Sequence, residues 1–219
     1  MAADGVRLRG RQAQAARNDE VILQAAREVF LADPDAPISA VAARAGVGIG
    51  ALYHRYASKQ DLLRTLCRSG QETYLRELRR ALARQGDPWE SFTEFLRSIV
   101  AAGTHGLVTR LAGMFVPDEE QLAIAEQMRA GSIELFEKAS ASGRLRADVS
   151  YLDVEFLLEF LAQVQLGDAE RTAELRQRYL AVIIDGLRGG CGRTPLPGEP
   201  PTWQEQTARW VPRSAGLPG

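Results

Sequence analysis

The sequence predicts an all-α protein in which a small three-helix head precedes a larger helical body. Apolar residues recur at helical spacing in most segments between residues 17 and 188. Two short segments of this kind, within residues 38–59, are separated by a glycine break that is typical of a helix-turn-helix. Clusters of Gly and Pro divide the following chain into further helices, which pack on one another through their apolar faces.

Length and composition place the chain among globular proteins. Its 219 residues suffice for one large or two small domains, and its apolar and charged fractions of 45% and 25% are ordinary. No apolar run reaches the roughly 18 residues of a membrane span, and no apolar stretch follows the N-terminal arginines as in a secretory signal. Cys67 and Cys191 are too few for a disulfide scaffold. We therefore expect a cytoplasmic protein without membrane contact.

The predicted head comprises residues 17–65. Residues 1–16 carry three arginines and no core pattern, which predicts a flexible basic arm that either reaches a DNA minor groove or has no role. Residues 17–32 have an apolar helical face, and the prolines within residues 33–37 end that helix. Pro37 suits the first position of the next helix.

The helix-turn-helix follows directly. Gly46 is expected to take a positive φ and end its first helix. Leu52 and Tyr56 stand four residues apart, so the second helix buries both on one side. The other side has small residues near its start and polar or basic residues near its end, which suits a helix that enters a major groove. These residues are Gly48, Ile49, Gly50, Ala51, Tyr53, His54 and Arg55.

Ser58 and Lys59 begin the next helix. Ser58 is a good N-cap, and Asp61 completes a pair that resembles a capping box. A lysine in the first turn opposes the helix dipole unless an anion, such as a DNA phosphate, binds there. A solvated lysine is the alternative, and the neighbouring helix-turn-helix favours the phosphate.

These motifs resemble the TetR family of transcriptional regulators. The resemblance covers about residues 17–65 and is carried by AAREVF, a Pro/Asp loop, AVAARAGV, GALYHRY and the SK pair. It implies a DNA-binding domain within a homodimer that binds a palindromic double-stranded DNA operator. The candidate DNA contacts are Arg44, Gly48, Ile49, Gly50, Ala51, Tyr53, His54, Arg55 and Lys59.

The chain departs from the family pattern near this surface. Ala36 and Pro37 stand where the family often has a hydroxyl residue that holds a phosphate, so this chain lacks that hydroxyl. Gly48 replaces a frequent serine. The reading helix is therefore unusually bare, and base readout would rest on Ile49 and His54 or on DNA shape.

Residues 66–188 are predicted to form a ligand-binding and dimerisation body. A long helix from residue 60 ends at Gly86-Asp87-Pro88, where the aspartate caps the next helix and the proline begins it. A shorter helix is expected up to Pro117, and another from Asp118 to near Gly143.

The last two body helices, Tyr151–Leu166 and Ala169–Arg188, are predicted to form the dimer interface. The first is apolar on more than one face, and one subunit would struggle to cover both helices. We expect them to pack against their copies as a four-helix interface, as the last two helices do in the TetR family. Complete burial within one subunit is the alternative.

Residues 189–219 contain 12 Gly or Pro in 31 positions. This composition predicts a mostly irregular tail. Trp203 and Trp210 lie seven positions apart, so a helical turn or two could dock onto the body.

The sequence contains no catalytic, cofactor or metal constellation. His54 and His105 lack metal-ligand spacing, and the motifs of nucleotide-binding and serine enzymes are missing. Large apolar side chains of the body could line an effector pocket between helices, or they could simply pack the core. The candidate residues are Trp89, Phe92, Phe95, His105, Met114, Phe115, Met128 and Phe156.

The predicted function is a ligand-responsive transcriptional regulator that is not an enzyme. We expect repression, because covering a promoter requires nothing else of the protein. A small apolar effector would release the dimer by binding a different spacing of the two heads more tightly. The alternative is an all-α small-molecule-binding protein or enzyme whose hairpin does not read DNA.

Overall fold

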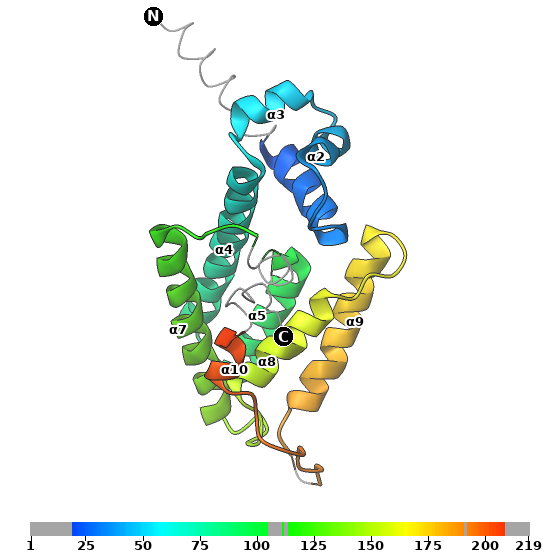
Figure 1. Ribbon diagram of the computed structural model, residues 1–219. Helices are drawn as coiled ribbons and strands as arrows, with labels where there is room; N and C mark the ends of the chain where they lie inside the picture. Colours follow the sequence, from blue (N-terminus) through cyan, green and yellow to red (C-terminus); the bar gives the residue numbers. More distant parts are fainter. Residues whose placement is uncertain (1–18, 105–110, 112–113, 191, 209–219) are drawn as a thin grey trace, which may run out of the picture. The chain divides into compact units, whose positions relative to one another are not determined.

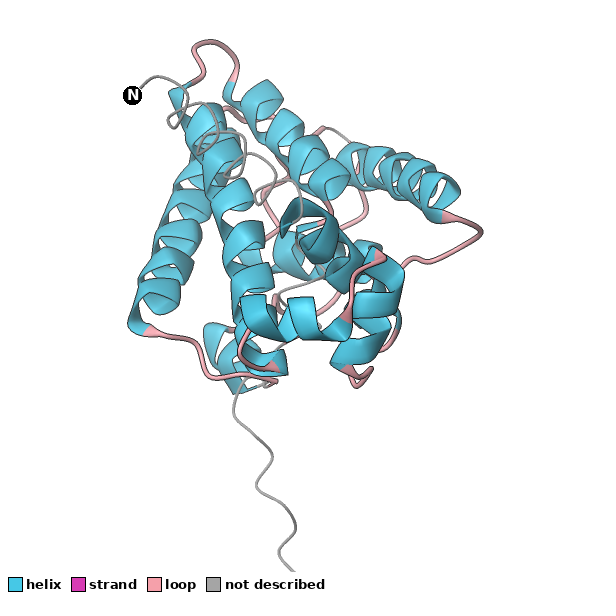
Figure 2. Ribbon diagram, turned by 90° about the horizontal axis from the view of Figure 1, so that it is seen from above, coloured by secondary structure: helices cyan, strands magenta, loops and turns pink. Residues whose placement is uncertain are grey.

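The computed structural model describes residues 19–104, 111, 114–190 and 192–208. Within these ranges every regular element is a helix, as Figures 1 and 2 show, apart from an isolated bridge between Leu145 and Arg188. The all-α prediction is therefore confirmed. Features that fall outside the described residues are the basic arm, most of the short helix expected before Pro117, and His105, Cys191 and Trp210.

The chain divides into two compact units, Met1–Cys67 and Arg68–Gly219. The boundary lies within a long helix, α4 (Lys59–Ala83). Cys67 is buried at the end of the first unit, and this burial raises the pKa of its thiol to about 12.

The first unit contains a helix over residues 19–32, then α2 (Ile38–Ala45), α3 (Ile49–Arg55) and the start of α4. Apolar side chains from each helix are buried, as their spacing in the sequence predicts. The larger ones are Ile22, Phe30, Ile38, Val41, Leu52, Leu62, Leu63 and Leu66.

Backbone residues rather than side-chain caps set the ends of α2. Pro37 precedes it, and Gly46 ends it with a φ of 67° and an N–H that points to the carbonyls of Ala42 and Ala43. The cap positions before α2 and α3, Pro37 and Gly48, make no side-chain cap hydrogen bond. Both helices are short, so their stability comes from packing.

The second unit contains α5 (Pro88–Ala102), α7 (Glu119–Ala141), α8 (Tyr151–Ala162), α9 (Ala169–Leu187) and the short α10 (Trp203–Ala208). Helix α5 contacts both α7 and α9, and α8 lies beside α9. A single apolar cluster fills the space between these helices. Its larger members are Tyr74, Leu78, Trp89, Phe92, Phe95, Leu96, Ile99, Leu135, Leu158, Leu161, Leu180 and Ile184.

Every one of the four long helices from α5 to α9 begins with a capping side chain. The cap oxygen accepts an N–H from the second or third residue after it, at distances between 2.8 and 3.2 Å. The predicted starts of α5, α7 and α8 are thereby confirmed. The caps are Asp87, Asp118, Ser150 and Asp168.

Helix α8 ends at Ala162 rather than at the predicted Leu166. Arg176 of α9 donates to the carbonyl of Ala162 at 2.7 Å and to that of Val164 at 3.1 Å. The guanidinium satisfies carbonyl groups at the helix end, so the chain can leave the helix there. Among the described helices, none combines the length and apolar character needed to cross a membrane.

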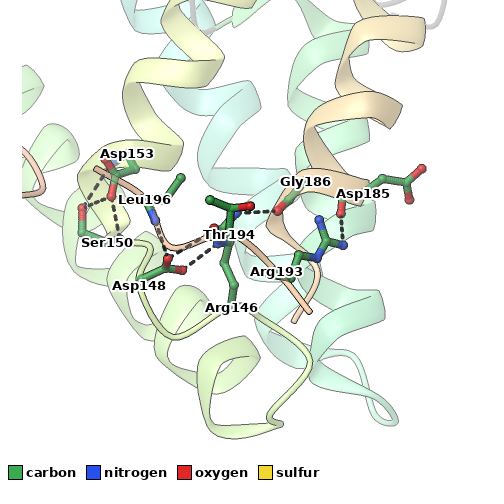
Figure 3. Close-up of polar contacts among 9 residues, drawn as sticks. All are labelled: Arg146, Asp148, Ser150, Asp153, Asp185, Gly186, Arg193, Thr194 and Leu196. Atoms are coloured by element: carbon green, nitrogen blue, oxygen red, sulfur yellow. Dashed lines mark hydrogen bonds and ion pairs between the residues drawn. The ribbon is translucent and has the colours of Figure 1, made fainter. Parts of the chain in front are cut away.

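The segment after α9 is bound to the loop between α7 and α8 (Figure 3). The Arg146 guanidinium contacts both carboxylate oxygens of Asp148, at 2.6 and 2.8 Å, and donates to the Thr194 carbonyl at 2.9 Å. Asp148 also accepts the N–H of Leu196 at 2.9 Å. We call residues 192–208 the C-terminal strap.

The strap continues to α10, where the Trp203 ring faces the guanidinium of Arg129 on α7 at 5.2 Å. This contact confirms the prediction that a short helical stretch of the tail docks onto the body. The strap before α10 is irregular, as its Gly and Pro content predicts.

Candidate functional site

One side of helix α3 packs against the rest of the first unit, and its other side is exposed. Leu52 is fully buried, and Tyr56, which ends the helix, is buried as well. Ile49 is 43% exposed and Tyr53 is 51% exposed. The other predicted DNA contacts on this segment, Gly48, Gly50, Ala51, His54 and Arg55, are also exposed.

The start of α3 is open. A Cβ atom added at Gly48 or Gly50 would meet no atom within 4 Å, so packing inside the protein does not require glycine at either position. Small residues at the start of a reading helix allow its backbone to approach the floor of a groove closely.

The two arginines beside α3 are paired with carboxylates of the first helix. Arg44, in the last turn of α2, places Nε 2.6 Å from Oε2 of Glu28. Arg55, the last residue of α3, forms an ion pair with Asp19. The sequence predicts both arginines as DNA contacts, but it gave no indication of these partners.

Lys59 lies at the start of α4 and is partly buried. Its Nζ donates to the Pro34 carbonyl at 3.0 Å and lies 5.2 Å from the centre of the Phe30 ring. An ammonium group has three donors, so two remain for a phosphate. The cap before it is confirmed in part, because Asp61 N–H donates to Ser58 Oγ at 3.1 Å.

The structure brings some of the predicted effector residues together. Trp89, Phe92 and Phe95 are buried in the core cluster of the second unit, and Met128 packs against it. The remaining described candidates, Met114, Phe115 and Phe156, are half-buried and do not belong to that cluster. His105 lies outside the described residues.

A group of polar side chains lies within the same unit. The hydroxyl groups of Tyr74 and Ser132 are 2.8 Å apart. Burial, and then the charge of Glu155, raise the pKa of Tyr74 and of Tyr151 far above the usual value. Helical periodicity places Tyr74 among the core-facing residues of its helix, where an aromatic ring is ordinary and no sequence signal indicates a polar role. Within the described residues, no group of three or more His, Cys, Asp or Glu could hold a metal ion.

Comparison with known proteins agrees with this architecture. Residues 22–66 match the family model of bacterial regulatory proteins of the tetR family, and residues 87–189 match that of the C-terminal domain of SbtR-like transcriptional regulators. The TetR transcription regulatory protein from Mycobacterium vanbaalenii is 30% identical, with 81% of this chain and 99% of that chain covered and a TM-score of 0.52. The chain belongs to the TetR family of transcriptional regulators.

Other TetR structures share the fold at lower identity. CprB from S. coelicolor A3(2) is 20% identical, with 81% of this chain and 92% of that chain covered and a TM-score of 0.60. LfrR from Mycobacterium smegmatis, solved in complex with proflavine, is 19% identical, with 77% and 96% covered and a TM-score of 0.51. Among curated protein sequences, no significant match is found.

Membership of the TetR family decides between the two functional classes that the sequence left open. The family consists of transcription regulators, which are not enzymes. Its members bind DNA operators as dimers and respond to small-molecule ligands. The C-terminal strap lies beyond both matched ranges, so it is not part of the matched TetR domains.

Proposed function

We propose that this TetR protein is a ligand-responsive repressor that acts in the cytoplasm. It binds a palindromic operator as a homodimer, and a small apolar effector releases it. Residues 17–65 bind DNA, while residues 66–188 bind the effector and the second subunit. The exposed face of α3, which is held by the buried Leu52 on its opposite side, is the observation that carries this proposal.

The candidate DNA-contacting residues divide into three roles. Gly48, Gly50 and Ala51 allow the helix to enter the groove closely. Ile49 and His54 are the candidates for contacts with base edges, which carry sequence information. Contacts with phosphates, which position the protein on the duplex, fall to Tyr53, Arg44, Arg55 and Lys59.

Exposed apolar residues on α8 and α9 support the proposed dimer. Phe160 on α8 is 63% exposed and Val182 on α9 is 67% exposed. Tyr179 on α9 and Leu166 in the loop between the two helices are also exposed. Large apolar side chains gathered on neighbouring helices are typical of an interface. We expect Val182→Glu combined with Phe160→Glu to yield monomers in sedimentation analysis and to abolish high-affinity operator binding. A variant that remains dimeric would contradict this interface.

The apolar core of the second unit supports the proposed effector class. Trp89, Phe92 and Phe95 supply large apolar surface. Among the described residues, Gln71 Oε1 and Thr104 Oγ1 are buried without a hydrogen-bond partner, so each could pair with a polar group of an otherwise apolar ligand. LfrR was solved with proflavine, which makes this dye a reasonable first probe.

Release by an effector requires two arrangements of the dimer. Two reading helices enter successive major grooves only when they are about 34–36 Å apart. An effector that binds a different spacing more tightly shifts the dimer away from the operator, by no more than its difference in affinity for the two arrangements.

The decisive experiment is DNA binding by the full chain. We expect specific binding to the DNA upstream of its own coding sequence, with a footprint of two related half-sites and an affinity that falls with salt. Tyr53→Ala and Lys59→Ala should weaken binding, whereas Lys138→Ala, an exposed lysine on α7, should not. No specific binding at about 100 mM salt, or unchanged binding by both variants, would contradict the proposal.

A further inference from the structure

The first helix of the head carries the carboxylates that pair with two arginines, one in the last turn of α2 and one at the end of α3. Both Nε and Nη2 of Arg44 contact Oε2 of Glu28, at 2.6 and 2.5 Å. The other oxygen of Glu28 accepts a hydrogen bond from Nε2 of Gln24 at 3.0 Å. Arg55 is paired with Asp19 near the start of the same helix. Two residues that lie far apart in this helix therefore fix one arginine on α2 and one on α3.

The Glu28 carboxylate is charged at neutral pH. The hydrogen bond from Gln24, together with the hydrogen bond and charge of Arg44, lowers the pKa of Glu28 despite its partial burial. An arginine has five N–H donors, and the contacts with Glu28 use those on Nε and Nη2 of Arg44. Each paired arginine can thus still reach a phosphate, but only in the direction that its carboxylate leaves open.

We propose that Asp19 and Glu28 are positioning residues that set the specificity of DNA binding. This inference rests on the DNA-binding function proposed above. Each carboxylate favours one direction of its arginine, and we expect a phosphate of the operator to lie in that direction. Each also cancels one positive charge beside α3, which reduces the sequence-independent attraction to phosphates.

Exposed ion pairs of this type are individually weak, about 0–1 kcal/mol, so a phosphate can compete with them. Neutralising a carboxylate should therefore free its arginine to contact phosphates of any sequence. Binding to unrelated DNA should tighten more than binding to the operator. Specificity, which is the ratio of the two affinities, should fall.

The test uses the full chain, a duplex with the footprinted operator and a scrambled duplex of equal length. For Glu28→Gln we expect roughly three- to tenfold tighter binding to the scrambled duplex, with a salt slope steeper by up to about 0.9. Asp19→Asn should act in the same direction. The matched control is Glu20→Gln, which removes the same charge from an exposed position of the same helix.

A second pair of variants separates the role of Glu28 in pairing from a general effect of its charge. In an Arg44→Gln background, Glu28→Gln should change binding no more than Glu20→Gln does. If Glu28→Gln and Glu20→Gln give the same salt slope and the same affinity ratio in the wild-type background, the inference is wrong. If the wild-type chain itself does not distinguish operator from scrambled duplex, the proposed DNA-binding function is what fails.

Discussion

Helices α2 and α3 of the first unit begin differently from the long helices of the second unit. In the second unit α5, α7, α8 and α9 each start with an Asp or Ser whose side chain accepts a backbone N–H. In the first unit α2 and α3 start after Pro37 and Gly48, which make no such bond. The body is therefore stabilised by local hydrogen bonds as well as packing, whereas α2 and α3 depend on packing and on ion pairs to the first helix.

The largest expected effect is in the head. Leu52 is the fully buried anchor of α3, so Leu52→Ala should destabilise the first unit by about 2–5 kcal/mol and abolish operator binding. Hydrogen exchange of the α3 amides in the full chain measures this loss. Tyr53→Ala, which changes the exposed neighbour, should weaken DNA binding while leaving exchange unchanged. A cost below about 1 kcal/mol for Leu52→Ala would show that packing does not hold α3.

Removing one N-cap side chain from the second unit tests whether local capping stabilises its helices. Asp168 accepts Arg171 N–H at 2.8 Å, so Asp168→Ala should lower the free energy of unfolding by about 1 kcal/mol. Urea denaturation followed by circular dichroism gives the value. Asp168→Asn retains a capping oxygen and serves as the control, with an expected loss of only a few tenths of a kcal/mol. Equal losses in the two variants would argue against capping as the cause.

The residues between α9 and the strap offer a test of close backbone packing. A Cβ at Gly189 would lie 3.1 Å from the carbonyl oxygen of Leu145, which is backbone and cannot easily move. We expect Gly189→Ala to destabilise the body by about 1 kcal/mol, measured by thermal unfolding. At Gly190 the same substitution meets open space and should be neutral. If Gly189→Ala leaves the stability unchanged, the backbone at this contact can move without a measurable loss of stability.

A smaller effect is expected from acid. Hydrogen bonds from Arg146 and from Leu196 N–H hold the pKa of Asp148 well below its usual value of 3.8. The stability that this carboxylate contributes is complete above the unfolded pKa and is lost as pH falls through the lower folded pKa. The difference in Tm between wild type and Asp148→Asn should thus be constant from pH 7 to about 5 and shrink below about pH 4. A difference that grows in acid would contradict this assignment.

The smallest effect is a gain. Gly48→Ser would add a cap to α3 in open space, and it should stabilise the head by a few tenths of a kcal/mol. Operator binding should persist, since serine is frequent at this position in the family. Slower hydrogen exchange of α3 amides would demonstrate the gain. Faster exchange would mean that the start of α3 requires glycine for another reason.

Features that depend on neighbouring residues could be predicted from the sequence. The turn at Gly46, the caps Asp87 and Ser150, and the inward side of α3 follow from spacing and local backbone chemistry. These signals lie within one helical turn of the feature they specify. The order of the helices and the exposed reading surface were therefore accessible before the structure was known.

Features that depend on contacts through space could not be predicted. Arg176 ends α8 from a different helix, and Glu28 holds Arg44 across 16 positions of the chain. The attachment of the strap to Arg146 is of the same kind. Each uses a common charged residue whose partner has no fixed sequence spacing, so periodicity and motifs contain no signal for it.

The burial of Cys67 gives a way to time transient opening of the chain. Because burial raises the pKa of Cys67 to about 12, very little of the reactive thiolate is present at pH 8 in the folded protein. In a Cys191→Ser background, alkylation of Cys67 by a maleimide would then proceed mainly through rare molecules in which the packing around Cys67 has opened. The rate of that reaction, followed by mass spectrometry with and without DNA, would report how often the protein opens around Cys67.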